Sequence, residues 1–209
     1  MNRGLFITLE GTEGVGKSTN LQFICDWLQA EGIPYLCTRE PGGTPLSETL
    51  REVLLAPREE RFDPLAELLL MFAARAQHLA EKILPALNQG TWVVCDRFTD
   101  ATYAYQGGGR GVDLSAIATL ENLVQGDLQP DAVIVLDVAP EIGLQRAQNR
   151  GAPDRFESEK IQFFERVRSV YLQRAAAHEE RYHVVDASRS LEHVQHSLLV
   201  VLQNIRAKV

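Results

Sequence analysis

A glycine-rich segment at residues 11–18 constrains this chain more than any other feature. It reads Gly-Thr-Glu-Gly-Val-Gly-Lys-Ser, which satisfies the pattern G-x-x-x-x-G-K-[ST], and it stands between a short apolar run and a helical pattern. Glycines let the backbone turn tightly, so that successive N–H groups and a helix N-terminus converge on phosphate oxygens. The segment therefore predicts a strand, a phosphate-binding loop and a helix, in that order.

The same segment predicts a site for a nucleoside triphosphate and Mg²⁺. Lys17 would supply a point charge to the β- and γ-phosphates, and Ser18 a hydroxyl ligand for the ion. The alternative is a glycine-rich turn with an incidental lysine, which would have to fall by chance at the right boundary between strand and helix. The residues expected to bind the triphosphate are Gly11, Thr12, Glu13, Gly14, Val15, Gly16, Lys17, Ser18 and Thr19.

Short apolar runs alternate with longer helical patterns along the whole chain. Strands are predicted at residues 5–10, 35–39, 92–96, 132–137 and 182–186. Helices are predicted at about residues 17–31, 46–56, 64–89, 114–125, 140–148, 158–178 and 190–208. Because the strand runs are continuously apolar, we expect an α/β fold in which a five-stranded parallel sheet carries helices on both faces. Ligands of such sheets bind beyond the carboxyl ends of the strands.

Composition places the chain among ordinary globular proteins and excludes some partners. Of its 209 residues 45% are hydrophobic and 23% charged, and no linker or repeat divides them, so we expect one domain over residues 1–209. Lysine and arginine number 21 against 28 aspartates and glutamates, and this net charge of −7 argues against a nucleic-acid polymer as a partner. The apolar run near the N-terminus is too short for a signal sequence, and no membrane segment is expected.

Three cysteines, Cys25, Cys37 and Cys95, stand among apolar neighbours. Their number and spacing match neither a disulfide framework nor a set of zinc ligands. We therefore expect buried thiols and a reducing, cytoplasmic location.

The predicted strand at residues 92–96 ends in a carboxylate that is followed by a cation. Asp96 at this strand end fits a role in holding the magnesium sphere, although it would also serve as a cap of the next turn. Arg97 would point into the same crevice, where its planar donor fork suits a second phosphate. The pair favours a site for two phosphorylated ligands.

A single charge interrupts the predicted helix at residues 64–89. Arg75 is the only formally charged residue between Leu68 and Ala80, and Phe72 lies three positions earlier on the same helical face. A flat ring beside a donor fork suits a nucleobase. The alternative is a core phenylalanine with an arginine that is paired to an internal carboxylate or extends its charged end to solvent. His78 has no metal-ligand set around it and is expected to be a satisfied histidine.

Two loops carry further polar groups. Residues 99–111 combine hydroxyls, an amide and two phenols with a glycine-rich break, which would line a pocket for sugar and base and allow close approach or a positive-φ turn. Residues 149–157 hold Arg150 and Arg155 beside Gly151, which predicts a short arginine-bearing lid. An ordinary solvated loop is the alternative for this second segment.

Together these motifs resemble thymidylate kinases of the bacterial type. The resemblance covers nearly the whole chain. It rests on the phosphate loop and on residues 38–44 (Thr-Arg-Glu-Pro-Gly-Gly-Thr), 70–75 (Leu-Met-Phe-Ala-Ala-Arg), 96–98, 104–111 and 154–156. The family implies the P-loop nucleoside monophosphate kinase fold.

For the acceptor nucleoside, the resemblance implies a pyrimidine pocket. Phe72 would stack on thymine and Arg75 would hydrogen-bond to its edge. Gln106 and Thr102 would complete the base pocket. Tyr103 would crowd the sugar 2′ position and exclude ribonucleotides by a steric clash.

For the transferred phosphate, the resemblance implies a set of arginines. Arg39 and Arg97 would bind the 5′-phosphate of the acceptor, with Glu13 near that nucleotide. The phosphate loop itself contains no arginine, so this chain is similar to members whose lid supplies it, and Arg150 or Arg155 is the candidate. Together with Lys17 and Arg97, these residues form the expected catalytic set.

The activity that the resemblance implies is Mg²⁺-dependent transfer of the γ-phosphoryl group of ATP to dTMP, giving dTDP for dTTP synthesis. It also implies a homodimer, for which the outer face of the helix at residues 64–89 is a candidate. Two alternatives stay open from the residues themselves. One is a kinase for another nucleoside monophosphate, and the other is a P-loop hydrolase or switch that cleaves ATP without an acceptor nucleotide.

Overall fold

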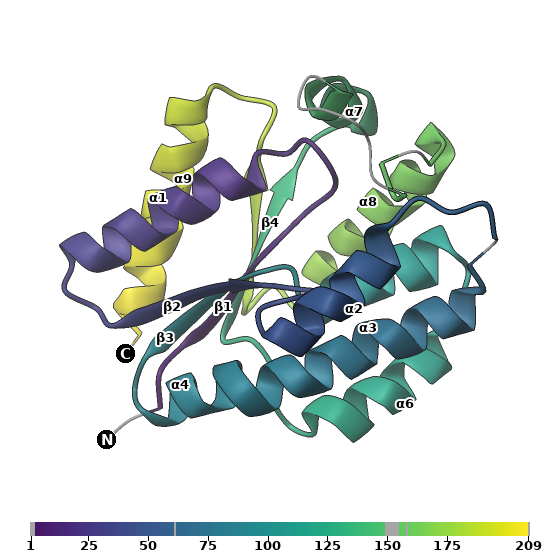
Figure 1. Cartoon of the computed structure of the whole chain (residues 1–209). Helices are drawn as coiled ribbons and strands as arrows, with labels where there is room; N and C mark the ends of the chain where they lie inside the picture. Colours follow the sequence, from purple (N-terminus) through teal and green to yellow (C-terminus); the bar gives the residue numbers. More distant parts are fainter. Residues whose placement is uncertain (1–2, 61, 149–154, 158, 209) are drawn as a thin grey trace.

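The computed structural model describes residues 3–60, 62–148, 155–157 and 159–208. Within these residues the strands form a five-stranded, all-parallel sheet in the order β2-β3-β1-β4-β5 (Figure 1). The strands are β1 (Phe6–Glu10), β2 (Tyr35–Arg39), β3 (Trp92–Asp96), β4 (Ala132–Asp137) and β5 (Tyr182–Asp186). The predicted α/β fold and its strands are therefore confirmed, with the first strand one residue shorter than expected.

Helices cover both faces of the sheet (Figure 1). On one face lie α1 (Lys17–Ala30) and α9 (Leu191–Arg206). The other helices include α2 (Pro45–Leu55), α3 (Pro64–His78), α6 (Leu114–Gln125), α7 (Pro140–Gln148) and α8 (Ile161–Ala177). Alternate residues of β4 show why both faces are apolar. Ile134 and Leu136 pack in the cluster that contains α1 and α9, whereas Val133 and Val135 pack with the aromatic residues of α8.

The two edge strands depart from the continuous burial that we predicted. Cys37 in β2 is exposed, and Val184 in β5 is 50% exposed, because each edge strand has a neighbour on one side alone. The expectation of a buried thiol is therefore wrong for Cys37 and confirmed for Cys25 and Cys95. No described helix is long and apolar enough to cross a membrane.

The helix predicted at residues 64–89 is interrupted. After α3, a π-helical turn η1 (Leu79–Ile83) leads into the short helix α4 (Leu84–Asn88). Pro85 lies in the first turn of α4, where it has no N–H to donate and its ring would meet the carbonyl four residues earlier. The wider π turn accommodates this proline within one continuous rod.

The segment at residues 99–111 is also more helical than we expected. It forms α5 (Thr99–Thr102) and a π helix η2 (Tyr103–Gly109), so the predicted glycine-rich break is wrong for residues 107–109. The expected close approach is present: a Cβ on Gly109 would lie 2.4 Å from Cε2 of Phe163 in α8. Positive φ begins only at Gly111, with φ 76°. Gly108 and Gly109 allow close packing against α8, and Gly107 allows it against α6.

Strand register brings the ends of β1, β2 and β3 to one place. Leu9 pairs with Asp96, and Arg39 pairs with the same residue from the other side. From β1 the chain continues to β2 and β3, which lie on one side of β1, and it then crosses to β4 on the other side of β1. The carboxyl end of β1 is therefore a topological switch point. The glycine-rich loop begins at this point.

A buried carboxylate lies directly beneath that loop. Glu10 at the end of β1 is fully buried and accepts hydrogen bonds from the Phe98 N–H (2.7 Å) and the Tyr171 hydroxyl (3.0 Å). Burial and the neighbouring Asp100 carboxylate raise the pKa of Glu10 to about 8. At neutral pH the folded chain therefore holds a proton here that the unfolded chain releases.

This proton predicts a specific dependence of stability on pH. Between the unfolded pKa of Glu10, near 4.5, and the folded value of about 8, the native state binds the additional proton, so the free energy of unfolding falls as pH rises. One proton contributes a slope of at most about 1.4 kcal/mol per pH unit. Urea unfolding of wild type and Glu10→Gln at pH 5, 6, 7 and 8 should show the wild type losing stability relative to the variant. Parallel curves for the two proteins would contradict the assignment.

Candidate active site

Three glycines with positive φ shape the loop after β1. Gly11, Gly14 and Gly16 have φ of 135°, 71° and 88°. A Cβ on Gly14 would lie 1.8 Å from the Gly143 carbonyl oxygen, so this position excludes any larger residue. Gly16 is the N-cap of α1 and has no side chain to occupy the helix N-terminus. The loop therefore presents backbone N–H groups and a helix dipole to an anion.

Lys17 spans this loop with its side chain. Its Nζ donates to the carbonyl oxygens of Thr12 (2.9 Å) and Gly11 (3.3 Å). Burial and the charge of Arg97 lower the pKa of Lys17, whereas nearby carboxylates oppose that shift. A phosphate group at the loop would compensate this buried cation.

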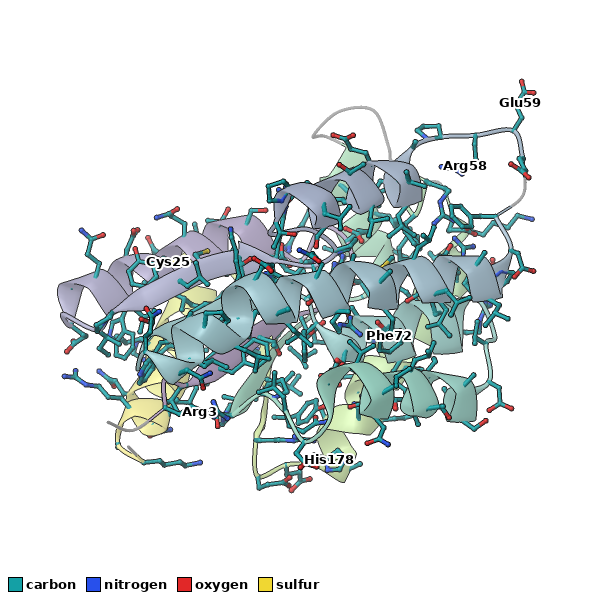
Figure 2. The ribbon with its side chains drawn as sticks, turned by 60° about the horizontal axis from the view of Figure 1, so that its bottom comes forward. Arg3, Cys25, Arg58, Glu59, Phe72 and His178 are labelled. Atoms are coloured by element: carbon teal, nitrogen blue, oxygen red, sulfur yellow. The ribbon has the colours of Figure 1, made fainter. Side chains whose placement is uncertain are left out.

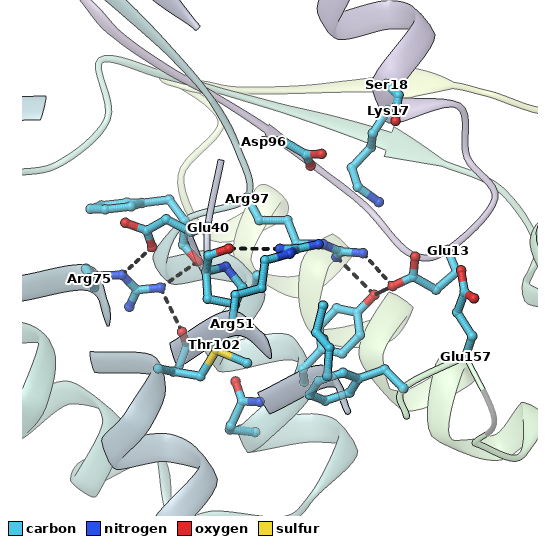
Figure 3. Close-up of a pocket in the computed structure, with 18 of the residues that line it drawn as sticks. Glu13, Lys17, Ser18, Glu40, Arg51, Arg75, Asp96, Arg97, Thr102 and Glu157 are labelled. Atoms are coloured by element: carbon cyan, nitrogen blue, oxygen red, sulfur yellow. Dashed lines mark hydrogen bonds and ion pairs between the residues drawn. The ribbon is translucent and has the colours of Figure 1, made fainter. Parts of the chain in front are cut away.

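A pocket extends from the loop along the carboxyl ends of β1 and β3 (Figure 3). Its loop end is lined by Glu13, Gly14, Gly16, Lys17, Ser18, Asp96 and Arg97. Its far end is lined by Arg51, Leu55, Met71, Arg75, Phe98, Ala101, Thr102, Tyr105, Gln106 and Phe156. Arg51 and Arg97 lie where the two ends meet, between Arg75 and Glu13 in Figure 3.

Asp96 and Ser18 face the pocket beside Lys17 (Figure 3). The Oδ1 atom of Asp96 is buried and has no hydrogen-bond partner within the described part of the chain. That part contains no group of three or more His, Cys, Asp or Glu side chains that would hold a metal ion by themselves. One free carboxylate oxygen and one hydroxyl fit Mg²⁺, an ion that takes most of its other ligands from phosphate and water.

Arg97 crosses the pocket in a strained backbone conformation. Its φ of 67° is unusual for a residue with a side chain and costs of order 1–3 kcal/mol. The guanidinium donates to Glu13 Oε1 (2.5 Å), the Gly11 carbonyl (2.9 Å) and the Tyr105 hydroxyl (3.0 Å). These contacts hold Arg97 and Glu13 together in the pocket.

A second arginine in the pocket comes from α2 and was missed by the sequence analysis. Arg51 donates to the Pro41 carbonyl oxygen (2.8 Å) and forms no salt bridge within the described residues. Burial and the charges of Arg39 and Arg97 lower its pKa, as expected for a cation in need of an anion. Its sequence signal was available, because Arg51 is the only basic residue in the helical pattern at residues 46–56.

Arg39 lies elsewhere, so its predicted placement in the pocket is wrong. Its side chain is 53% exposed and pairs with Glu48 (2.9 Å). It lines a neighbouring hollow, which shares Ser18 and Asp96 with the pocket and also contains Cys37 and Lys82. Successive residues of a strand point to opposite faces, and the side chain of Arg39 turns away from the pocket toward α2.

Arg75 is held almost completely buried at the far end of the pocket. Its Nε donates to Glu40 (2.7 Å), and its Nη2 donates to the Phe98 carbonyl and the Thr102 hydroxyl, both at 3.0 Å (Figure 3). The residue is 3% exposed, yet Nη1 is buried without a hydrogen-bond partner among the described residues. Arg75 is thus paired with an internal carboxylate, as the alternative interpretation expected. It also keeps one free donor, Nη1, which suits the interpretation that Arg75 binds a nucleobase.

Glu40, the carboxylate that pairs with Arg75, also pairs with His78. The Nδ1 of His78 donates to Glu40 Oε1 (3.0 Å), and its Nε2 lies 2.7 Å from the Thr38 hydroxyl. His78 is fully buried with both nitrogens paired. It is a satisfied histidine, as we predicted, and the structure places it in the core.

The predicted orientation of Phe72 toward the pocket is wrong. Its ring is buried against Leu68 and Ile117, between α3 and α6 (Figure 2), and it does not line the pocket. Met71 lines the pocket instead. Both positions neighbour Arg75 on a helix of 3.6 residues per turn, at spacings of three and four, so periodicity alone did not distinguish them.

Of the residues expected in η2 and α5, two line the pocket and one does not. Thr102 and Gln106 line it, and Gln106 Nε2 donates to the buried carboxylate of Glu67 (2.7 Å). The expected placement of Tyr103 is wrong, because its hydroxyl donates to Glu121 (2.7 Å) and its ring stacks against Arg174. Tyr105, two residues later, occupies the pocket wall.

Arg150 and most of the predicted lid lie outside the described residues, whereas Arg155 is described. Arg155 Nη1 lies 2.7 Å from Glu67 Oε2, and its Nε donates to the Leu54 carbonyl oxygen (2.8 Å). The guanidinium is therefore engaged at the junction of α2 and α3. Phe156 and Glu157, which follow it, line the pocket.

Comparisons with known proteins agree on one family. The family model described as thymidylate kinase matches residues 9–198. The thymidylate kinase of Pseudomonas fluorescens strain SBW25 is 60% identical over 97% of this chain and 96% of its own length. That of Chromohalobacter salexigens is 62% identical over 95% of this chain and 94% of its own.

A solved structure is similar over nearly the same span. The crystal structure of thymidylate kinase from Ehrlichia chaffeensis matches with a TM-score of 0.78 and 34% sequence identity, covering 96% of this chain and 99% of that one. Its fold is the one described above. The chain belongs to the thymidylate kinase family.

Proposed function

We propose that the protein transfers the γ-phosphoryl group of ATP to dTMP, giving dTDP and ADP. One observation carries the proposal: a single pocket joins a phosphate-binding loop to the buried, unsatisfied Nη1 donor of Arg75 at its far end. An acceptor nucleotide with its base at Arg75 would direct its phosphate toward the loop. Family membership supports the same reaction.

At the donor end, the loop residues Gly11 to Thr19 and the ammonium group of Lys17 would hold the phosphates of ATP. Ser18 and the free oxygen of Asp96 would hold Mg²⁺. The ion, when bound, neutralises charge on the β- and γ-phosphates.

At the acceptor end, Arg51 and Arg97 would bind the 5′-phosphate, and Arg51 takes the role that the sequence analysis gave to Arg39. Both line the pocket between its two ends (Figure 3). Charge-assisted hydrogen bonds from two guanidinium groups are suited to a phosphate dianion. Glu13 and Tyr105 hold Arg97 in place, so Glu13 acts through this arginine.

The base would lie between apolar and polar walls. Met71 and Phe98 supply the apolar contacts in place of Phe72, while Arg75, Thr102 and Gln106 supply hydrogen-bonding groups. The acceptor phosphate attacks as an anion, so no side chain is needed as a general base. Orientation of the two phosphates and stabilisation of the transferring charge supply the catalysis.

Arg150 stays our prediction for the arginine that stabilises the transferring phosphoryl group. Arg155, the other candidate, is paired with Glu67, which favours an anchoring role for it. We also propose that the enzyme works in the cytoplasm, because its three cysteines are unpaired thiols suited to a reducing compartment.

The proposed reaction predicts that turnover of ATP requires an acceptor. Purified protein with ATP and Mg²⁺ should release little ADP until dTMP is added, and dTMP should exceed dUMP, UMP, AMP and GMP in kcat/KM. A coupled assay of ADP measures both. Equal ADP release without any monophosphate would indicate a hydrolase instead.

The proposed phosphate site predicts different effects of two neighbouring arginines. Arg51→Ala should raise the KM for dTMP about 10- to 100-fold, because one charge-assisted hydrogen bond contributes about 1.5–3 kcal/mol. Arg39→Ala, the matched control, should change it several-fold at most, since Arg39 is exposed and paired with Glu48. Steady-state kinetics at saturating ATP test this. A larger rise of the KM for dTMP in Arg39→Ala than in Arg51→Ala would show that Arg39 binds the 5′-phosphate instead.

We further propose a homodimer through the outer face of α3, η1 and α4. Exposed apolar residues follow this rod at spacings of three and four, which places them on one face. They are Leu65, Leu69, Ala73, Ala76, Ala80 and Leu84. Such a stripe marks an interaction surface, and its central alanines allow an identical rod to approach closely in a two-fold arrangement.

A charge in the middle of this stripe should therefore separate the subunits. Ala76→Glu should give the mass of one chain, and wild type that of two, in size-exclusion chromatography with light scattering. Val200→Glu is the control, because Val200 is 45% exposed on the distant helix α9. An unchanged mass for Ala76→Glu would place the interface, if one forms, elsewhere.

A further inference from the structure

One buried carboxylate is not used by the mechanism above. Glu67 in α3 is fully buried and does not line the pocket. Its Oε1 accepts from Gln106 Nε2 (2.7 Å), and its Oε2 lies 2.7 Å from Arg155 Nη1 and 3.4 Å from Arg110 Nε. Glu67 therefore contacts a pocket residue, Gln106, without lining the pocket itself.

This contact determines which end of the Gln106 amide faces the pocket. A carboxylate between two guanidinium groups accepts hydrogen bonds and donates none, so it requires the NH₂ group of Gln106 on its side. Gln106 is 1% exposed, and its Oε1 accepts no hydrogen bond from the described residues. The amide thus offers an acceptor, Oε1, to a ligand in the pocket.

Arg75 offers the complementary group on the same wall. Its Nε is fixed by Glu40, and its Nη2 by Phe98 and Thr102, which leaves Nη1 as a buried donor without a partner among the described residues. A guanidinium has no acceptor atom, so this position is always a donor. The wall therefore presents one fixed donor, Nη1 of Arg75, and one acceptor, Oε1 of Gln106. Glu67 decides that the second group is an acceptor, because it holds the NH₂ group of Gln106 on its own side.

We propose that Glu67 is a positioning residue that sets the hydrogen-bonding polarity of the base pocket. A pyrimidine with a 4-carbonyl beside an N3–H matches the donor of Arg75 and the acceptor of Gln106. A pyrimidine with a 4-amino group beside an unprotonated N3 opposes both. Glu67 thus excludes aminopyrimidine nucleotides without touching them, because burying unpaired polar groups is costly.

The test compares two substrates that differ at this edge alone, dTMP and 5-methyl-dCMP. In Glu67→Gln, the guanidinium groups of Arg155 and Arg110, which lie 2.7 Å and 3.4 Å from the present Oε2, favour the new amide oxygen on their side, because a guanidinium has no acceptor atom. The new NH₂ group then faces Gln106 and turns its amide over, so the pocket offers a second donor. We expect kcat/KM for dTMP to fall about tenfold, the preference for dTMP over 5-methyl-dCMP to narrow at least tenfold, and the KM for ATP to stay unchanged.

A matched control and a rescue variant accompany this change. Glu159→Gln removes another carboxylate from the same cluster, one that pairs with Arg110 and does not contact Gln106. Glu159→Gln should leave the preference for dTMP over 5-methyl-dCMP as in wild type. The double variant Glu67→Gln with Gln106→Glu again gives the pocket an acceptor, because a carboxylate at position 106 cannot donate. It should recover the preference for dTMP, and it remains informative if Glu67→Gln alone does not fold.

The inference rests on the proposed function, and the two fail differently. If wild type does not phosphorylate dTMP, the proposed function is wrong. If wild type is active but Glu67→Gln lowers kcat/KM for dTMP and 5-methyl-dCMP by the same factor, Glu67 is merely structural and the inference is overturned. The inference would also be overturned if Glu159→Gln narrowed the preference for dTMP over 5-methyl-dCMP as much as Glu67→Gln does. It would likewise be overturned if the double variant preferred 5-methyl-dCMP.

Discussion

The pocket depends on the pairing of buried and half-buried guanidinium groups with carboxylates from other elements. Arg75 is paired with Glu40, Arg97 with Glu13, and Arg155 with Glu67, and each pair joins segments distant in sequence. Breaking a buried pair such as Arg75–Glu40 by removing one partner costs about 3–5 kcal/mol, so this pair is part of the fold as well as of the site. Arg51 is the exception. Without a carboxylate partner in the described residues, it is the arginine with most to gain from a bound phosphate.

The sheet and the helices contribute to the site in different ways. The register of β1 against β3 brings the glycine-rich loop beside Asp96, at the end of two strands that are buried along nearly their whole length. The far end lies between α3 and η2, where side-chain pairing decides which atoms face the ligand. The donor end therefore recognises phosphate mainly through backbone geometry, and the acceptor end recognises a base through orientated side chains.

Much of the fold and the donor end could be predicted, because the signals are local. Continuous apolar runs identified the strands, and the glycine-lysine-serine spacing identified the loop. Errors arose where a local pattern had two equivalent solutions. Met71 and Phe72 both neighbour Arg75, Tyr103 and Tyr105 stand two residues apart in η2, and the glycines of that helix looked like a break. Arg51 was overlooked beside Arg39 because an exposed ion pair and a pocket cation look alike in sequence.

By itself, the sequence determined the α/β alternation, the phosphate loop and the residue types needed to bind two phosphorylated ligands. These follow from periodicity and from short motifs, which act over one strand or one helical turn. Only the tertiary structure decided which arginine enters the pocket, which aromatic ring is core, and which end of the Gln106 amide faces a base. The reason is physical: a side chain's direction is set by the partner it meets across the fold, and Glu67, Glu40 and Glu13 reach their partners from elements far away in the chain.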